Sequence, residues 1–162
     1  VGWSLLVCLV LHLSEGFTYD PSAKFCTEKS VTQKQLEELL EGRICTRFTG
    51  RLTFTEDDYE INDVVKKIER IVGCIEIMES RITEADFPAL EEIKWVYTYC
   101  PTTYGLFVVA NDNLTRLSFH RNFRLGGNEA FIRANKELYK ESIFPDGRNF
   151  SLGKFEGITY AL

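Results

Sequence analysis

The sequence predicts a mainly β protein, α+β by content, in which short parallel strands stack into a solenoid behind one N-terminal helix. Two observations predict this fold: a repeated apolar-x-apolar-x-x-small polar pattern, and a helical segment flanked by two cysteines. A length of 162 residues fits one domain, and a hydrophobic content of 44% is enough for a core.

The N-terminal segment is predicted to be a signal peptide, residues 1–16. Residues 1–13 are almost all apolar, a run too short to span a membrane and of the length of a signal-peptide core. Ser14 and Gly16 are small residues that suit cleavage after Gly16. A buried core segment would explain the same run. The signal reading predicts a secreted protein or the ectodomain of a truncated membrane protein, and residues 17–25 then form an N-terminal extension.

Cysteine usage indicates disulfides. Cys8 lies in the signal segment, and the other four are Cys26, Cys45, Cys74 and Cys100. Four cysteines in an oxidising compartment allow three pairings. Zinc binding is disfavoured, since no two cysteines are closely spaced and His120 is the only histidine beyond the signal segment. We expect no metal and no cofactor.

A helix is predicted over residues 31–41. Its leucines share one face: Leu36, Leu39 and Leu40. Thr32 can cap its N-terminus, with Gln35 completing a capping box, and Gly42 can end it. A bridge between Cys26 and Cys45 would fasten this helix to the chain that follows.

The repeat occupies most of the remaining chain. Its four copies are Leu52, Phe54 and Asp57; Ile75, Ile77 and Ser80; Leu106, Val108 and Asn111; and Ala130, Ile132 and Asn135. A further apolar residue follows each copy: Tyr59, Ile82, Leu114 and Leu138. A glycine precedes each copy, where we expect tight corners: Gly50, Gly73, Gly105 and Gly127. A period in the twenties built on short strands predicts a solenoid.

The copies recur after 23, 31 and 24 residues, and an insertion explains the long interval. Ile71 lies four residues before Ile75, whereas the equivalent Ile93 lies thirteen residues before Leu106. The nine extra residues fall roughly at residues 97–104 and include Cys100. We expect Ile71 and Ile93 to belong to a second face of each turn.

Alternation along the strands predicts an outward face. Its residues are Thr53, Thr55, Glu76, Met78, Phe107, Val109, Phe131 and Arg133. In register, Phe107 lies beside Phe131 with Met78 nearby, and Glu76 and Arg133 form the rim. Such an apolar patch has the character of an interaction surface. A loop, the C-terminal tail or a second domain could cover it instead.

The stretch of residues 26–138 resembles the receptor L domains of insulin- and EGF-receptor ectodomains. The resemblance rests on Cys26, the helix, Cys45 and a glycine five residues later, Gly50. Asn135 and Leu138 match the family's terminal motif, with Tyr139 in place of its cysteine. The chain is most similar to the kinase-less members.

The resemblance implies a right-handed parallel β-helix, leucine-rich-repeat-like, over residues 26–142. It also implies an extracellular module that binds a peptide or protein ligand, with Cys26 bonded to Cys45. Cys74 then remains for Cys100, which lies in the insertion leading to the neighbouring strand. We expect residues 143–162 to be a C-terminal tail or the start of a truncated region.

Other classes of function are less favoured. The chain has no nucleophile elbow, phosphate loop or His-Glu-x-x-His motif, so no enzyme is predicted and no catalytic residue is proposed. A net charge of −5 disfavours nucleic acid, and no further long apolar run indicates membrane insertion. Two alternatives remain: a secreted leucine-rich-repeat-like structural or adhesion protein, and a carbohydrate-active β-helix enzyme. Sequons at Asn113 and Asn149 predict a glycoprotein.

Overall fold

The computed structural model describes residues 16–126 and 129–138. The predicted signal peptide up to residue 15, Gly127, Asn149 and the tail over residues 143–162 lie outside the described residues. Within them the chain is mainly β with two short helices. No helix in these two ranges is long and apolar enough to cross a membrane.

Ten strands and two helices follow one another along the described chain. They are β1 (Thr18–Asp20), β2 (Phe25–Thr32), α1 (Gln33–Leu40), β3 (Arg47–Phe54), α2 (Asp63–Lys66), β4 (Arg70–Met78), β5 (Glu84–Phe87), β6 (Glu92–Lys94), β7 (Tyr104–Val109), β8 (Arg116–Phe119), β9 (Arg124–Gly126) and β10 (Glu129–Arg133).

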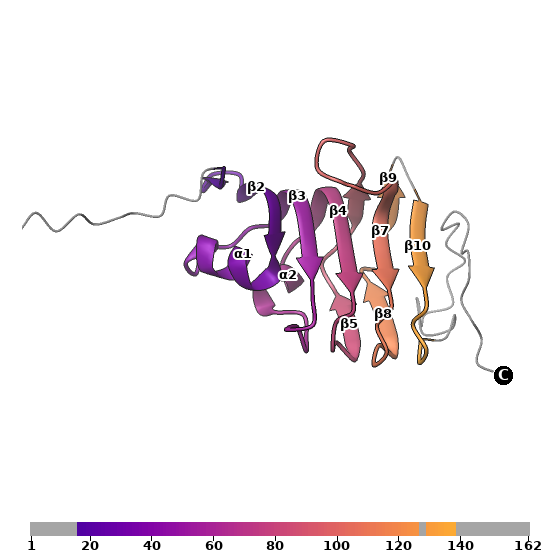
Figure 1. Ribbon diagram of the computed structural model, residues 1–162. Coiled ribbons are helices and arrows are strands. Elements are labelled where there is room, and N and C mark those ends of the chain that lie inside the picture. The colour runs from indigo at the N-terminus through magenta and orange to yellow at the C-terminus, as the bar shows by residue number, and fades with distance from the viewer. Residues whose placement is uncertain (1–15, 127–128, 139–162) are drawn as a thin grey trace, which may run out of the picture.

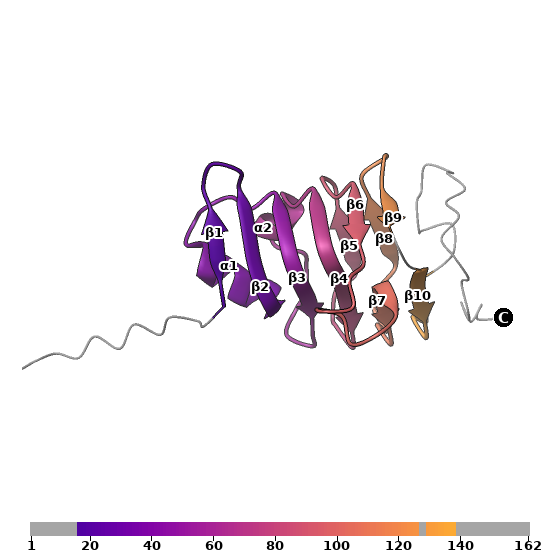
Figure 2. The same ribbon diagram turned by 90° about the horizontal axis from the view of Figure 1, so that it is seen from above.

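The strands of a large main sheet run side by side through the molecule (Figure 1), and the view from above places β6 and β9 apart from β7 and β10 (Figure 2). Its order is β1-β2-β3-β4-β6-β9, and β7 pairs with both β4 and β10. The sheet is mixed, because β1 runs antiparallel to β2 while the other pairs among its described strands are parallel. Residues 17–25, predicted to be an extension, therefore contribute an edge strand to this sheet.

A second sheet of β5 and β8 lies behind the main sheet, and α1 and α2 lie at the N-terminal end of the same layer (Figure 2). A run of aromatic rings crosses the core between the layers. Phe54 meets Phe87 edge-on at 5.9 Å, Phe87 stacks on Phe119 at 5.4 Å, and Phe119 stacks on Phe123 at 4.1 Å. The repeat pattern did not predict this second sheet.

The predicted phase of the repeat is confirmed by the strand register. Two inward rows of aligned residues run across the main sheet: Leu52, Ile75, Leu106 and Ala130; and Phe54, Ile77, Val108 and Ile132. All eight are buried, as alternation predicts for the face of a sheet that packs on a core.

The predicted insertion is also confirmed. Ile93 in β6 pairs with Ile71 in β4, and Leu106 in β7 pairs with Ile75 in the same strand. Strands β6 and β7 thus pair with successive parts of the same continuous strand, β4, and the insertion separates them. Ile71 and Ile93, expected on a second face of each turn, both lie in strands, because the strands begin earlier than the repeat indicated.

Gly50, Gly73 and Gly105, where corners were expected, lie within strands. Gly50 and Gly73 are paired across β3 and β4, at φ of 142° and 146°. A Cβ atom on Gly50 would lie 1.7 Å from the Glu28 carbonyl oxygen, and one on Gly73 would lie 1.9 Å from the Gly50 carbonyl oxygen. Both glycines are needed because the neighbouring backbone occupies the space of a side chain.

Short polar side chains close the turns after the strands, as the repeat predicts for three of its copies. The Ser80 N–H and hydroxyl both donate to Asn111 Oδ1, at 2.9 and 2.8 Å. Asn111 Nδ2 donates to the Ile77 carbonyl and to Asn135 Oδ1, each at 2.9 Å. These three residues form a buried polar ladder that ties consecutive turns together.

The first copy of the repeat departs from the prediction. Asp57 is exposed, and the buried carboxylate is that of Asp58, which accepts from Gln33 Nε2 at 2.6 Å and from the Thr55 N–H at 2.7 Å. Tyr59 is likewise exposed, and Ile61 is the buried apolar residue. The turn after β3 is offset because it connects to α2 rather than to a strand.

The helix is confirmed, over a shorter range. Thr32 caps α1 in a capping box with Gln35, and Glu41 adopts the left-handed conformation ahead of Gly42. Val31 belongs to β2 instead of the helix.

The two predicted disulfides are confirmed. Cys26 bonds to Cys45, with 5.8 Å between their Cα atoms, and Cys74 bonds to Cys100, with 6.0 Å.

Candidate binding surface

Five side chains form an aromatic patch on the outward face of β4, β7 and β10: Met78, Tyr104, Phe107, Val109 and Phe131. The rings of Phe107 and Phe131 stack, with centroids 5.3 Å apart and planes at 12°. The Tyr104 ring lies 4.9 Å from that of Phe131 and 6.2 Å from that of Phe107. Met78 is 42% exposed and the other four are partly exposed, so these apolar side chains remain at the surface.

The structure brings together most of the outward residues that the sequence predicted. One row across the sheet contains Thr53, Glu76, Phe107 and Phe131, and the next contains Met78, Val109 and Arg133. Thr55 is the exception, because β3 ends at Phe54 and the Thr55 N–H already bonds to Asp58 in the following turn.

Tyr104 is the ring that the sequence analysis missed. It was assigned to the insertion, yet it is the first residue of β7 and pairs with Glu129 of β10. The register shifts directly after this pair, so the strict alternation that identified the other outward residues does not reach it.

Glu76 was predicted to lie on the rim but is buried. Its side chain is 10% exposed, because it lies in the row between Thr53 and the ring of Phe107. Its Oε2 atom is 3.8 Å from a guanidinium nitrogen of Arg51, and its Oε1 atom has no hydrogen-bond partner among the described residues. Burial raises the pKa of Glu76, and the positive charge of Arg51 only partly opposes this shift.

The inserted segment is fastened to the sheet beside this patch. Cys74, two residues before Glu76 in β4, holds Cys100 of the insertion. Trp95 Nε1 donates to the Thr102 carbonyl at 3.1 Å, which closes the segment on itself. A disulfide and a hydrogen bond therefore limit how far the insertion can move relative to the patch.

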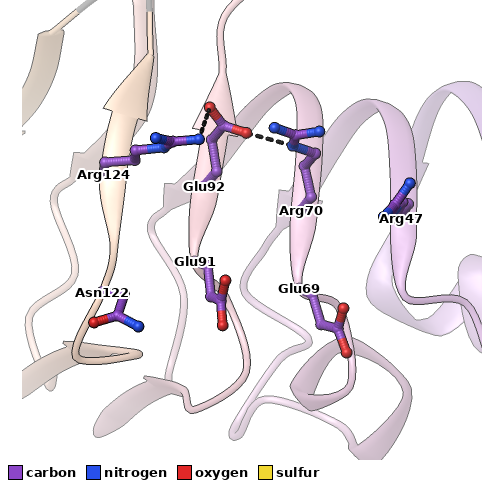
Figure 3. Close-up of a pocket in the computed structure, with 7 residues that line it drawn as sticks. All are labelled: Arg47, Glu69, Arg70, Glu91, Glu92, Asn122 and Arg124. Atoms are coloured by element: carbon purple, nitrogen blue, oxygen red, sulfur yellow. Dashed lines mark hydrogen bonds and ion pairs between the residues drawn. The ribbon is translucent and has the colours of Figure 1, made fainter.

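A second feature, a charged cleft of about 390 Å³, lies at the beginning of strands β3, β4, β6 and β9. Its lining residues are Arg47, Glu69, Arg70, Glu91, Glu92, Asn122 and Arg124. Four of them form one row across the sheet, and Glu69, Glu91 and Asn122 form a row below it (Figure 3). This cleft was not predicted from the sequence, because its residues come from four segments that lie far apart along the chain.

Half of the six charged residues of the cleft are paired within it. Glu92 pairs with Arg70 and, at 3.2 Å, with Arg124. The guanidinium of Arg47 lies 5.1 Å from the ring centroid of Phe25. Three arginines face three glutamates, so the cleft attracts neither sign of charge strongly.

His120, the histidine considered in the sequence analysis, lies in a turn. Its Nδ1 atom accepts from the Asn122 N–H at 3.1 Å and lies 3.7 Å from a Glu91 oxygen. Across the described ranges, no group of three or more His, Cys, Asp or Glu side chains could hold a metal ion.

The sequon at Asn113 falls in the turn after β7, where Asn113 is exposed. Its glycosylation remains a prediction.

One face of the main sheet packs on the core, and the other carries the aromatic patch. Together with the two disulfides, this arrangement is typical of a disulfide-linked β binding module. The family model of the receptor L domain matches residues 44–148, and the chain belongs to the receptor L domain family. Receptor L domains are ligand-binding modules of receptor ectodomains and bind protein ligands. No curated protein and no solved structure matches the chain significantly.

Proposed function

We propose that the chain is an extracellular, non-catalytic module that binds a peptide or protein partner through the aromatic patch. The observation that carries the proposal is the stacked, partly exposed pair Phe107 and Phe131, joined by Tyr104 on the outward face of the main sheet. Aromatic residues are enriched at the centres of protein interfaces, where they bury a large area at a low entropic cost.

Further features support this proposal. Two disulfides fit an oxidising compartment, as does the predicted signal peptide. The family is one of binding modules, which supports a role without catalysis. Parallel pairing of successive turns supports the finer inference that the chain coils as a right-handed β-helix.

The test compares three secreted proteins in a binding screen against an array of extracellular domains: the wild type, Phe107→Asp with Phe131→Asp, and the control Tyr59→Asp. Tyr59 is 62% exposed and lies in the turn after β3, away from the patch. We expect the double variant to be secreted and to lose an array partner that the wild type and the control both bind.

Two results would contradict the proposal. If the double variant binds every partner that the wild type binds, another surface is used. If it is retained in the cell unfolded while Tyr59→Asp is secreted, the two rings belong to the core and the patch is not a free surface.

A further inference from the structure

The buried carboxylate of Glu76 is unusual for a position on the outward face of the sheet. The Arg51 guanidinium that lies 3.8 Å away directs Nε and Nη2 to the Ser30 hydroxyl, at 3.1 and 2.9 Å. The second oxygen of Glu76 has no partner in the part of the chain that the structure describes. Buried charges in proteins are normally paired and hydrogen-bonded, since an unpaired one is costly.

One face of the Phe107 ring stacks on Phe131, so its other face is turned toward β4 and this carboxylate. Phe107 is the neighbour of Glu76 across β4 and β7, and Phe131 follows in β10. The faces of aromatic rings attract cations, more strongly where water is partly excluded. The carboxylate and the aromatic rings in this row therefore both favour a cationic ligand group.

The other side chains of the patch suit the stem of such a group. Met78 and Val109 lie in the adjacent row and offer apolar contact to the methylene groups of a lysine or arginine. Arg133 stands at the far end of that row, exposed, and its charge disfavours a cation there. Within the patch, a cationic group is therefore favoured at the end near Glu76 over the end near Arg133.

We propose that the partner of the patch presents a lysine or arginine side chain, which lies across Phe107 and Phe131 with its charged end beside Glu76. This inference rests on the proposed function and specifies the chemistry of the partner. Because only a tenth of the Glu76 side chain is exposed, we expect one end-on charge contact rather than a bidentate pair.

The probes for the test are two peptides, acetyl-Leu-Arg-Leu-amide and the same peptide with citrulline, which keeps the shape of arginine without its charge. Each is titrated into the full chain labelled with ¹⁵N and followed by NMR. We expect the arginine peptide to shift the amide signals of Glu76, Phe107 and Phe131 and to bind about three- to thirtyfold more tightly than the citrulline peptide.

The matched variants are Glu76→Gln and Glu84→Gln. Glu84 is an exposed glutamate of β5 in the second sheet. We expect Glu76→Gln to remove the preference for arginine and Glu84→Gln to preserve it. In the wild type, the preference should also shrink as the pH falls and Glu76 is protonated; the charged side chain beside it is that of Arg51, and Arg133 lies at the far end of the patch.

Several results would overturn the inference. Equal binding of both peptides at the patch would remove the cation preference while leaving the proposed function standing. Shifts confined to the charged cleft would place the cation site there. Signals of residues 139–162 released on titration, or shifts that depend on protein concentration without peptide, would identify the chain's own C-terminal segment or a second copy as the occupant.

Discussion

At the scale of single residues, the side chain of Asn111 joins three segments of the chain by hydrogen bonds. It is fully buried and bonds to the Ser80 hydroxyl, to the carbonyls of Ile77 and Val109, and to Asn135. Ala110, directly before it, is held at a φ of 57°, a left-handed conformation that lets the asparagine turn inward.

Replacing Asn111 by Ala should lower the free energy of unfolding by about 2–4 kcal/mol, because several buried donors and acceptors lose their partner together. Glu56→Ala, at an exposed residue of the turn after β3, should change it by less than about 0.5 kcal/mol. Denaturant titration measures both. Equal, small effects would mean that water replaces the asparagine without cost.

Glu76 should make stability depend on pH. Burial raises its pKa in the folded protein above the ordinary 4.5, whereas the unfolded chain keeps the ordinary value. Between these two values the folded protein binds more protons, so the free energy of unfolding falls as the pH rises through the window.

Glu76→Gln should remove this contribution, so that the wild type loses stability relative to the variant from about pH 4.5 upward. Denaturant titrations at a series of pH values give the difference, with Glu84→Gln as a control that keeps the slope of the wild type. A constant difference between wild type and Glu76→Gln would show that the folded state does not perturb this carboxyl group.

At the scale of elements, the close approach of β2, β3 and β4 depends on two glycines. The missing side chains of Gly50 and Gly73 leave room for the backbone of the preceding strand, and the two residues face each other in register.

Gly73→Ala should destabilise the protein severely, since its Cβ atom would lie 1.9 Å from a backbone oxygen that the sheet holds in place. Gly42→Ala is the control: Gly42 has a φ of 82° but no atom within 4 Å of an added Cβ, so only the conformational penalty of about 1 kcal/mol applies. Secretion level and thermal unfolding compare the two. Similar effects would mean that the strands separate to admit the methyl group.

Much of the main sheet could be predicted from the sequence, because alternation and period determine which residues align. The register of Leu52, Ile75 and Leu106 and the nine-residue insertion follow from counting. The first residues of β3 and β4 could not be predicted from the repeat. They are Arg47 and Arg70, and these charged residues lie outside the apolar pattern by which the strands were recognised.

The candidate site was predicted in part. The pairing of Phe107 with Phe131 follows from the repeat, whereas the burial of Glu76 depends on its neighbours across the sheet, Thr53 and Phe107. The second sheet escaped prediction because Ala85, Phe87, Leu117 and Phe119 belong to short strands outside the repeated pattern.

At the scale of the whole molecule, the two disulfides restrain different parts. Cys26–Cys45 spans 19 residues and joins the start of β2 to the chain after α1. Cys74–Cys100 spans 26 residues and joins the centre of β4 to the insertion.

Replacing Cys74 and Cys100 together by Ser should lower the free energy of unfolding by about 3 kcal/mol in the chain-entropy treatment of a loop of this length. Denaturant titration measures the loss, and limited proteolysis reports cleavage within residues 95–103. Cleavage there without a change in global stability would show that the bridge only restrains the insertion.

The segment between β6 and β7 is a site where a foreign peptide could be inserted. Both flanks are held by one neighbour, Lys94 beside Val72 and Leu106 beside Ile75, so the points of departure and return lie only about 10 Å apart along β4. A longer peptide spliced between them would leave the alignment of every strand untouched, and each doubling of its length would cost only about 0.6 kcal/mol. The chain could therefore display a recognition peptide of almost any size at a fixed position on its sheet.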